Sequence, residues 1–468
     1  MSAINNDATE DSAVEPAREP WRSFLRLRVA SLTPRARHYE RKAAEMRSIL
    51  GITAEYDPFH NGHAYQIRQA RDLCCPDAVI CAMSGDFTQR GEPAILDKWE
   101  RAALAARSGA DLVFELPFIY SCQRAEYFAA GAVDLLVSAG ATHISFGCEA
   151  EHPEELQRLA VLLREHEKEL ETRAREHMSG GCSRAKAQEL ACREMFGEEM
   201  TSLMLEPNNI LALEYLRRML WWEHEHGVSV TAVPVRRFGS GYRQADEKSG
   251  FAGGTALRQM IASGEDIDRF VPYPVGDHDT SIGLDAVHDL AWTDIEAAHR
   301  KLYELVRGII LRSTPRQLAA GYGIGEGMEN RLLREAVRCE SYDAFLDAMV
   351  SRRYTASAIR RIMVWLLMGM EERPKAPAYG RVLAATAAGR TVLRELADSQ
   401  KESAESGRLA VDQSASLCVI SDGNRMEDLD PEILAAYQLD RRAADMFHLV
   451  TGQPLDENSD GRRHPWMG

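Results

Sequence analysis

The sequence predicts a doubly wound α/β fold, in which helices cover both faces of a parallel sheet, followed by a mainly helical C-terminal region. Apolar runs of strand length alternate with amphipathic segments between residues 48 and 147. Continuous apolar strands are typical of parallel sheets, because both faces of such a sheet are buried. Strand character then fades after about residue 270, and helical patterns continue to residue 395.

Four strands are expected before residue 150, at residues 48–53, 78–83, 111–116 and 143–147. Helices are expected between them, at residues 63–73, 96–110 and 125–140. Residues 151–230 are predicted to be mainly helical, and residues 228–235 to form a fifth strand. The last segment, after the polar stretch over residues 399–408 and up to about residue 452, is predicted to contain a short strand and a helix. Motif-like residues follow the strands in "EYDPFHNGH", "SGDFTQRGEPA", "ELPFIYSCQRAE" and "FGCE". Since ligands of such Rossmann-like sheets bind beyond the carboxyl ends of the strands, these motifs predict one shared site.

Composition narrows the class of protein. The chain has 468 residues, 45% of them hydrophobic, which allows two or three domains, and no apolar run approaches the ~18 residues of a membrane span. The nine cysteines form no C-x-x-C pair, so we expect reduced cytosolic thiols rather than a zinc ribbon or a disulfide framework. A net charge of −15 means that any nucleic acid must bind through local basic patches.

The strongest motif is His60-Asn61-Gly62-His63, where the first strand hands over to a helix. Gly62 lets backbone N–H groups approach a ligand, Pro58 shapes the turn, and the helix N-terminus favours an anion. His60 and His63 lie one turn apart and can donate hydrogen bonds to oxygens that gain charge as pyrophosphate leaves. We therefore predict a nucleoside triphosphate site, with a pair of structural histidines as the alternative.

A second phosphate site is expected in "GFAGGTALRQMI", residues 250–261, where a glycine-rich turn runs into a helix. Thr255 is a suitable N-cap, and Arg258 can pair with phosphate oxygens. A plain helix cap is the alternative for this segment, and the neighbouring histidine motif favours the phosphate site.

Together these motifs resemble the nucleotidylyltransferase superfamily with a HIGH-type signature. The match is closer to the tRNA(Met) cytidine acetate ligase family, whose successive blocks appear in order from about Met46 to Gly452. The matching blocks are "GITAEYDPFHNGHAYQI", "MSGDFTQRGEPAILDKW", "ADLVFELPF", "QRAEYFAAGAV", "SFGCE", "EPNNILALEYL", "VRRFGSGY", "GIGEGMENRL", "SRRYTASAIRRIMVWLLMG", "YGRVLAAT" and "DPEILAAYQLDRRAADMF".

The resemblance implies an enzyme that forms acetyl-adenylate from ATP and acetate. It would pass the acetyl group to N4 of the wobble cytidine, position 34, of elongator tRNA(Met). Magnesium is expected because it neutralises the triphosphate. The implied catalytic residues are His60, His63 and Arg258. The implied ATP site comprises Thr53, Ala54, Glu55, Tyr56, Asp57, Pro58, Phe59, His60, Asn61, Gly62, His63, Ala64, Tyr65, Gln66, Gly147, Asn208, Arg237, Thr255 and Arg258.

Three positions depart from the family pattern. Asp57 stands where the family has Asn, Gln66 where a third histidine is expected, and Gly253 where a Ser usually opens the turn. These changes put the details of phosphate contact in doubt but leave the H-x-G-H motif intact. For Asn208, a helix N-cap before "ILALEYLRRM" is the alternative role.

Two further sets of residues are predicted from their charge. Gln89, Arg90 and Lys98 could hold a carboxylate or the acyl group, with a solvated surface loop as the alternative for Lys98. The RNA-binding candidates form two basic clusters whose alternative is an exposed solvated face. Their members are Arg236, Arg237 and Arg243 in the first, and Arg353, Arg360 and Arg361, expected on one helix face, in the second.

The expected division is a disordered extension over 1–46, an ATP-binding catalytic domain over 47–270, a mainly helical tRNA-binding domain over 271–452, and a tail over 453–468. Within the extension, residues 22–47 are basic and could form a helix or an RNA-attracting arm. Two other functions stay open: a nucleotidylyltransferase that adenylates another carboxylate or a cofactor precursor, and an RNA-binding protein that keeps ATP without turnover.

Overall fold

The structure, a computed structural model, describes residues 47–237, 250–273, 290, 292–325, 327–376, 379–405, 417–423, 426, 429–455 and 460–468. The expectations for the extension over residues 1–46 and for Arg243 therefore lie outside the described residues. Residues Arg47–Gly468 form one compact unit.

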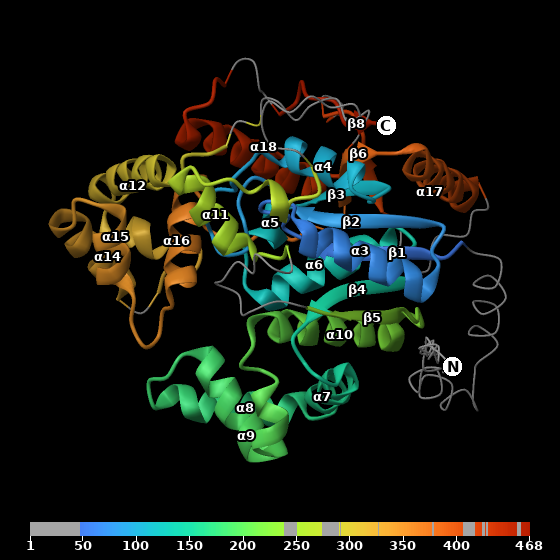
Figure 1. The fold of residues 1–468 in the computed structure, drawn as a ribbon. Helices are drawn as coiled ribbons and strands as arrows, with labels where there is room; N and C mark the ends of the chain where they lie inside the picture. The colour runs from blue at the N-terminus through green and yellow to red at the C-terminus, as the bar shows by residue number, and fades with distance from the viewer. Residues whose placement is uncertain are drawn as a thin grey trace, which may run out of the picture. The chain divides into compact units, whose positions relative to one another are not determined.

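One mostly parallel sheet organises this unit, with its strands in the order β5-β4-β1-β2-β3-β6-β7 and β8 paired to β6 (Figure 1). The first five strands run parallel, and β6 is antiparallel to β3. The strands are β1 (Ile49–Ala54), β2 (Ala78–Ser84), β3 (Leu112–Leu116), β4 (His143–Cys148), β5 (Thr231–Arg236), β6 (Tyr379–Ala385), β7 (Cys418–Ile420) and β8 (Trp466–Met467). The predicted fold class is confirmed, and the five expected strands lie within about two residues of β1–β5, apart from the later start of the fifth.

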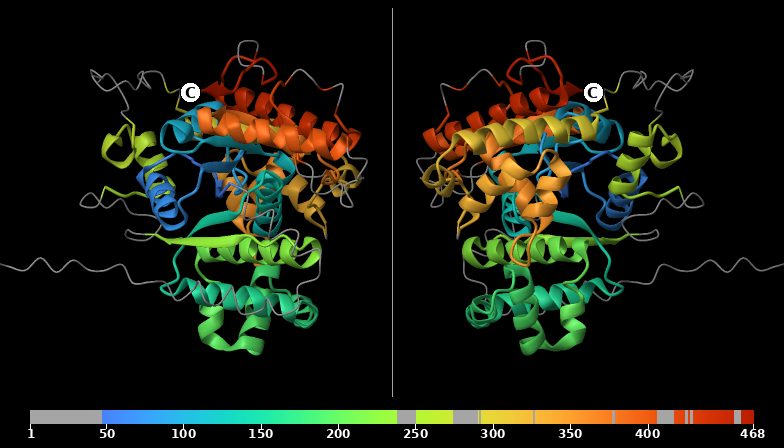
Figure 2. Two further views of the ribbon diagram at one scale, coloured as in Figure 1. Left: turned by 90° about the vertical axis from the view of Figure 1, so that its right-hand side faces the viewer. Right: turned by 90° about the vertical axis from the view of Figure 1, so that its left-hand side faces the viewer.

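Helices cover both faces of the sheet, as continuous apolar strands require. One core joins the strands to α6 (Ala125–Ser138), α7 (Pro153–Glu165) and α10 (Pro207–His226). The core on the other face includes residues of α3 (Asn61–Cys74), α4 (Lys98–Arg107) and α11 (Gly254–Ser263). In the left view of Figure 2, α3 (blue) and α11 (yellow-green) lie to the left of the strands. All seven side chains of β2 are buried, because this strand lies inside the sheet.

A third core belongs to helices at one end of the sheet, here called the helical group: α12 (Ile295–Arg312), α13 (Pro315–Ala319), α14 (Met328–Arg338), α15 (Tyr342–Met349) and α16 (Ala356–Met368). This core also contains residues of α5 (Phe118–Ser121) and α18 (Pro431–Thr451), so the group packs directly beside the sheet. The remaining helices are α8 (Glu167–Ser179), α9 (Arg184–Ser202), α17 (Ala387–Glu405) and the 3₁₀ turn η2 (Asp268–Phe270).

Strand β6 corrects the expectation that helices dominate to residue 395. Its sequence, "YGRVLAA", contains two alanines and a glycine, which have low strand propensity, so no strand signal is visible. Its seven residues are buried, and it pairs with β3 from Leu112–Ala385 to Glu115–Arg381. The C-terminal region therefore completes the sheet, and the structure shows no division at residue 270.

The segment expected as a tail also belongs to the fold. Within it, β8 pairs with β6, and the Asp460 side chain is buried with 2% exposure. A short strand so rich in polar neighbours carries little hydrophobic signal, which explains why the sequence did not predict it.

Candidate active site

The H-x-G-H motif lies at the topological switch point of the sheet. From β1 the chain builds β2 and β3 on one side, and β4 and β5 on the other, so the crevice between β1 and β4 opens at their carboxyl ends. Helix α3 follows β1 and begins in this crevice, with His60 as its N-cap. Tyr56, at φ 51°, and the cis Asp57–Pro58 bond shape the short connection.

The two imidazoles form a reciprocal capping box. Nδ1 of His60 accepts the Gly62 N–H at 3.0 Å, and Nδ1 of His63 accepts the His60 N–H at 3.2 Å. The rings are stacked, with 3.7 Å between their centroids. Because each Nδ1 is an acceptor, each neutral ring carries its proton on Nε2, which is then a donor. The pair therefore offers two neighbouring N–H groups at a helix N-terminus, which suits an anion.

Both rings are neutral in this state. Burial lowers the pKa of His60 to about 3, with Arg237 and Arg258 adding to the effect. Burial, His60 and Arg237 hold the pKa of His63 well below its usual value. The positive charge of the site thus comes from the arginines, and the histidines contribute oriented donors.

The side chains of the other residues between Thr53 and Gln66 lie in different environments. Tyr56 and Phe59 are buried in the core and pack edge-on or tilted against the His63 ring, so their side chains support the histidine motif from the core. The Asn61 amide donates to the Gly250 and Arg269 carbonyls at 3.1 and 2.8 Å. The implied ATP contacts of this stretch stay a prediction.

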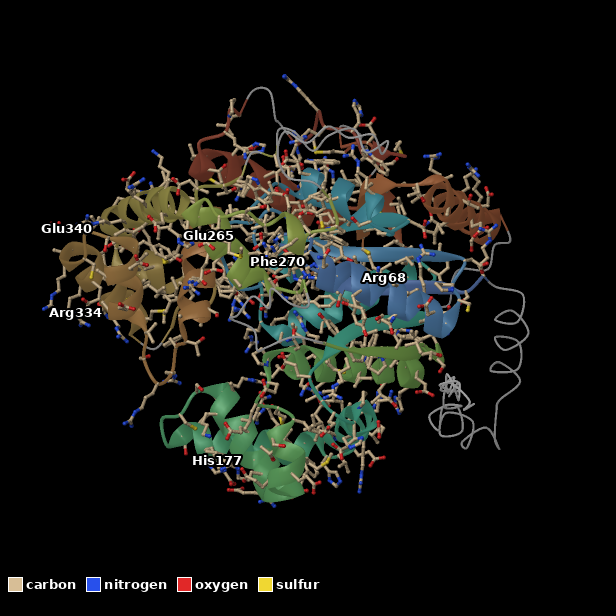
Figure 3. All side chains as sticks on the ribbon, in the orientation of Figure 1. Arg68, His177, Glu265, Phe270, Arg334 and Glu340 are labelled. Atoms are coloured by element: carbon tan, nitrogen blue, oxygen red, sulfur yellow. The ribbon has the colours of Figure 1, made fainter. Side chains whose placement is uncertain are left out.

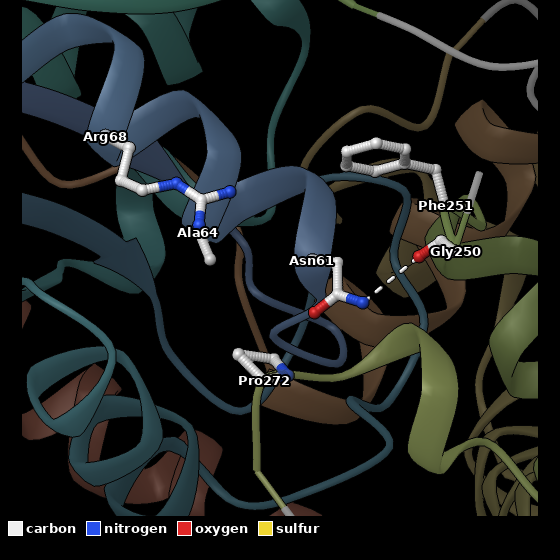
Figure 4. Close-up of a pocket in the computed structure, with 6 residues that line it drawn as sticks. All are labelled: Asn61, Ala64, Arg68, Gly250, Phe251 and Pro272. Atoms are coloured by element: carbon white, nitrogen blue, oxygen red, sulfur yellow. Dashed lines mark hydrogen bonds between the residues drawn. The ribbon is translucent and has the colours of Figure 1, made fainter.

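A cavity of ≈ 310 Å³ lies beside the start of α3 (Figure 4). Asn61, Ala64 and Arg68 follow one face of the helix and line it, whereas His60, His63 and Gln66 follow another. The Gln66 amide donates to Ser145 of β4 at 3.3 Å, so Gln66 lies over the crevice. Tyr65 packs edge-on against Phe251, beside the cavity.

The side of the crevice at β4 brings Gly147, Asn208 and Arg237 together. A Cβ on Gly147 would lie 3.3 Å from the Arg237 side chain, so the arginine crosses the end of β4 closely. Arg237 donates to Asn208 Oδ1 at 3.0 Å, and Asn208 donates to Glu149 Oε1 at 2.5 Å. Asn208 is the second residue of α10 and Glu206 is its N-cap, so the capping alternative is wrong.

The expected second phosphate site packs onto the motif. Arg258 donates to the Asp57 carbonyl at 2.7 Å and to its carboxylate at 3.1 Å, and a Cβ on Gly254 would lie 3.0 Å from that carbonyl. The N-cap of α11 is Gly253 without a side-chain bond, so the N-cap prediction for Thr255 is wrong. The Thr255 hydroxyl instead accepts a hydrogen bond from the Arg258 guanidinium at 3.3 Å.

Comparison with known proteins agrees with this arrangement. The model of the HIGH Nucleotidyl Transferase family matches residues 46–458. A tRNA(Met) cytidine acetate ligase of Thermoanaerobacter sp. is 33% identical over 74% of this chain and 86% of that protein. The enzymes of that name from Syntrophotalea carbinolica and Syntrophomonas wolfei are 34% and 30% identical, over 74% and 87% of this chain and 82% and 96% of theirs. The chain belongs to the tRNA(Met) cytidine acetate ligase family.

A solved structure agrees with the assignment. Thermotoga maritima TmcAL bound with alpha-thio ATP superposes with a TM-score of 0.73 and 27% sequence identity, over 90% of this chain and 99% of that one. Its apo form gives the same values. The likeness spans the parallel sheet and the C-terminal helices alike, because it covers nearly all of both chains.

Lys98 differs from its predicted place on the acyl side. It is 1% exposed, and Nζ lies 2.8 Å from Glu115, 3.0 Å from Asp460 and 3.7 Å from Asp86. Burial opposes its charge, but these carboxylates outweigh burial and raise the pKa of the amine. Lys98 is therefore the centre of a buried ion cluster, and neither the acyl-site nor the surface-loop interpretation holds.

The acyl-side role of Gln89 and Arg90 stays a prediction. They occupy a turn over Thr88–Glu92, in which the Thr88 N–H donates to the Glu92 carbonyl at 2.9 Å. The Gln89 N–H donates to Glu55 Oε1 at 2.6 Å. Both side chains are partly exposed at the carboxyl end of the sheet.

The predicted arginine face of residues 353–361 is not formed. Arg353 precedes α16, whose N-cap is Thr355. Arg360 pairs with Glu92 at 3.2 Å, and Arg361 is 8% exposed and donates to the Gln89 carbonyl at 3.1 Å. Arg236 is exposed at the end of β5, and its neighbour Arg237 turns into the crevice.

Two site residues were missed. Arg101 is fully buried, and its guanidinium donates to four carbonyls, of Glu55 at 2.6 Å, Gly85 at 2.5 Å, Leu96 at 3.0 Å and Ser84 at 3.2 Å. Asn209 Oδ1 accepts the Glu149 and Ala150 N–H groups at 2.9 and 3.2 Å. An arginine on an amphipathic helix normally faces solvent, so only its place three residues after Lys98, on the same helix face, could have suggested a buried role.

Among the described residues, no group of three or more His, Cys, Asp or Glu side chains is placed to hold a metal ion. None of the described helices combines the length and apolar character needed to cross a membrane. All nine cysteines are free thiols.

Proposed function

We propose that this chain activates acetate with ATP as acetyl-adenylate and transfers the acetyl group to N4 of the wobble cytidine of elongator tRNA(Met). The observation that carries the proposal is the pair of neutral imidazoles whose Nε2–H donors open α3 at the switch point of the sheet. The substrate names come from the three relatives named above, each called tRNA(Met) cytidine acetate ligase.

ATP would lie across the crevice, with its base end toward β4 and its phosphates toward α3 and α11. Gly147 and Asn208 border the nucleoside end, and Arg237 lies between them and the histidines. Arg258, which already contacts the Asp57 carboxylate, would add positive charge beside the phosphates. ATP enters as its magnesium complex, in which phosphate oxygens and water supply most ligands, so no carboxylate cage is needed.

In the first step an acetate oxygen attacks the α-phosphorus and pyrophosphate leaves. The Nε2–H groups of His60 and His63 donate to the oxygens that gain charge, and such oriented donors need no reorganisation during the reaction. Gln89 and Arg90, in the turn that follows β2, would orient acetate. In the second step the cytidine amine attacks the acetyl carbonyl and AMP leaves.

We propose that tRNA binds across the helical region, residues 271–452, and the exposed end of β5. Exposed cations there include Arg236 and Arg353, while Arg334 and Glu340 lie at the outer border of the helical group (Figure 3). With a net charge of −15, such local contacts must carry the attraction. The reaction would take place in the cytoplasm, where its substrates are found and thiols stay reduced.

The test is ATP–pyrophosphate exchange by purified protein with magnesium and acetate, followed by analysis of tRNA for N4-acetylcytidine. Acetate-dependent exchange that is lost in a His60→Ala/His63→Ala variant, together with N4-acetylcytidine at position 34, is the expected result. Exchange supported by another acid and not by acetate would overturn the acetate assignment. Acetylation of a different tRNA position would overturn the proposed acceptor.

A further inference from the structure

Glu55 stands at the carboxyl end of β1, on the side of the sheet away from α3. Alternate residues of a strand face the same side. Gly51 packs against Leu136 of α6, and Thr53 bonds to Tyr215 of α10, so Glu55 follows them toward the α6 and α10 face. The stacked histidines begin α3, which covers the opposite face.

Backbone groups fix the position of Glu55. Oε1 accepts the Gln89 N–H at 2.6 Å, and the Glu55 carbonyl accepts from Arg101 at 2.6 Å. Arg101 joins the same point to the end of β2 through the Ser84 and Gly85 carbonyls. The Glu55 carboxylate, which directly follows β1 at the carboxyl end of the sheet, is thus oriented through Oε1 by a neutral N–H donor.

The turn that holds Glu55 is itself fixed to the helical group. Gly91 has φ 78°, and a Cβ there would lie 2.5 Å from the backbone nitrogen of Arg361. Arg361 donates to the Gln89 carbonyl, and Arg360 pairs with Glu92, so both ends of the turn contact α16. A segment far along the chain therefore sets where the Glu55 carboxylate lies.

The surroundings favour a carboxylate that can take up a proton. Burial raises the pKa of Glu55, and the Gln89 N–H only partly opposes this effect. The charged or titratable groups that act on Glu55, or on which Glu55 acts, are Asp57, Arg90, Arg258, Cys122 and Tyr215. A general base works best when its pKa is moved toward the working pH.

The other ionisable groups at this edge are committed elsewhere. In their capping tautomer, His60 and His63 present Nε2–H donors, which cannot accept a proton. The Asp57 carboxylate takes the Ile95 N–H at 2.6 Å and pairs with Arg258, and Lys98 is enclosed by three carboxylates.

We propose that Glu55 is the general base of the acyl-transfer step, a proposal that rests on the proposed function. The exocyclic amine attacks the acetyl carbonyl carbon, so that a C–N bond forms. The nitrogen becomes cationic and gives its proton to Glu55 Oε2. The bond between the carbonyl carbon and the phosphate oxygen then breaks, AMP leaves with the electron pair, and the proton passes from Glu55 to solvent.

The experiment measures the two half-reactions separately in wild type, Glu55→Gln and Glu55→Asp. Acetate-dependent ATP–pyrophosphate exchange reports adenylation, and single-turnover transfer from preformed acetyl-adenylate to tRNA reports the second step. Gln keeps the oxygen that accepts the Gln89 N–H but cannot take a proton. We expect Glu55→Gln to slow transfer by about 10²–10³-fold more than it slows exchange, since general-base catalysis is worth roughly 10²–10⁴-fold and any lost ATP contact affects exchange alone.

The pH profile of transfer distinguishes a general-base role of Glu55 from a purely structural one. Wild-type transfer should fall as pH is lowered through the raised pKa of Glu55, Glu55→Asp should be slower but keep that limb, and Glu55→Gln should lose it. Glu92→Gln, which removes a carboxylate from the same turn, is the matched control and should keep the limb. Equal losses of exchange and transfer in Glu55→Gln, or an unchanged transfer profile, would overturn the proposal. The transfer assay starts from preformed acetyl-adenylate, so it tests Glu55 independently of the adenylation step. Absence of acetate-dependent exchange in the wild type would instead contradict the proposed function.

Discussion

His60 and His63 lie stacked with 3.7 Å between their ring centroids, and each ring satisfies a backbone N–H of the turn that carries the other. One side of each imidazole therefore belongs to the helix cap, and the other side is left for the substrate. Folding of the N-terminus of α3 and orientation of the donors are the same event. This double use makes the two roles separable by substitution.

Replacing His60 by Asn or by Gln should separate capping from catalysis. Asn places its carbonyl oxygen near Nδ1 and keeps the cap, whereas Gln reaches the Nε2 position and gives up the cap. We expect His60→Asn to keep the melting temperature and to slow ATP–pyrophosphate exchange by about 10²–10³-fold, as for loss of one transition-state donor. His60→Gln should melt lower, with a cap loss of about 1 kcal/mol, and retain more exchange. Equal exchange rates in the two variants would contradict a donor at Nε2.

The neutral histidines predict a pH dependence of stability. The pKa of His60 is about 3 in the folded protein and near 6.5 when unfolded, so the unfolded chain binds more protons between these values. Stability is therefore complete above about pH 6.5 and is lost as pH falls toward 3, and His63 acts in the same direction. The slope is at most about 1.4 kcal/mol per pH unit for one group.

Urea unfolding of wild type and His60→Asn at several pH values measures this effect as a difference. The variant should lose less stability on acidification, since Asn does not titrate. Parallel pH curves for the two proteins would show that His60 binds its proton equally well in the folded and unfolded states.

Lys98→Met tests the buried ion cluster. Removing the amine leaves Glu115, Asp460 and Asp86 without their shared cation, and breaking a buried pair costs about 3–5 kcal/mol. Chemical denaturation should show this loss, and Lys98→Met/Glu115→Gln should regain part of it because one carboxylate is removed as well. Unchanged stability with a raised KM for acetate would instead return Lys98 to the acyl side.

Gly147→Ala tests the approach of Arg237 to the end of β4. The new methyl group would lie 3.3 Å from Cγ and Cδ of a flexible side chain, so Arg237 must move by a few tenths of an ångström. We expect KM for ATP to rise severalfold with less than about 1 kcal/mol lost in stability, because the strand itself is not strained. Arg237→Gln should raise KM similarly, and the double variant should add little, since both changes act through one contact. Additive effects would place Arg237 away from Gly147 in the working enzyme.

The parallel half of the fold was predictable because its strands are continuous apolar runs followed by glycine, proline and histidine motifs. The motif residues at the strand ends, such as His60, Gly147 and Arg237, come together as expected because parallel strands end at one edge. Strand β6 was not predictable, since its alanines give no strand signal and its partner, β3, is more than 250 residues earlier.

Charge was the least reliable guide to position. Lys98 was expected on the acyl side and Arg361 on an RNA-binding face, and Arg101 was assigned no role. All three are buried. Their burial depends on carboxylates and carbonyls supplied by distant segments, and one sequence gives no sign of such pairing. Asn209, by contrast, adjoins Asn208 in the matching block, so position alone could have drawn attention to it.

The Lys98 cluster also bears on how the protein is made. Asp460, which accepts from Trp99 and pairs with Lys98, is 361 residues beyond Trp99 along the chain. A ribosome exposes α4 long before it has translated residue 460. Until then, Lys98 lacks one of the three carboxylates that surround its amine in the fold. During synthesis the sheet therefore stays incomplete and accessible to chaperones and proteases until the C-terminus is made. A truncation near the C-terminus would then destabilise the part of the chain that is translated first.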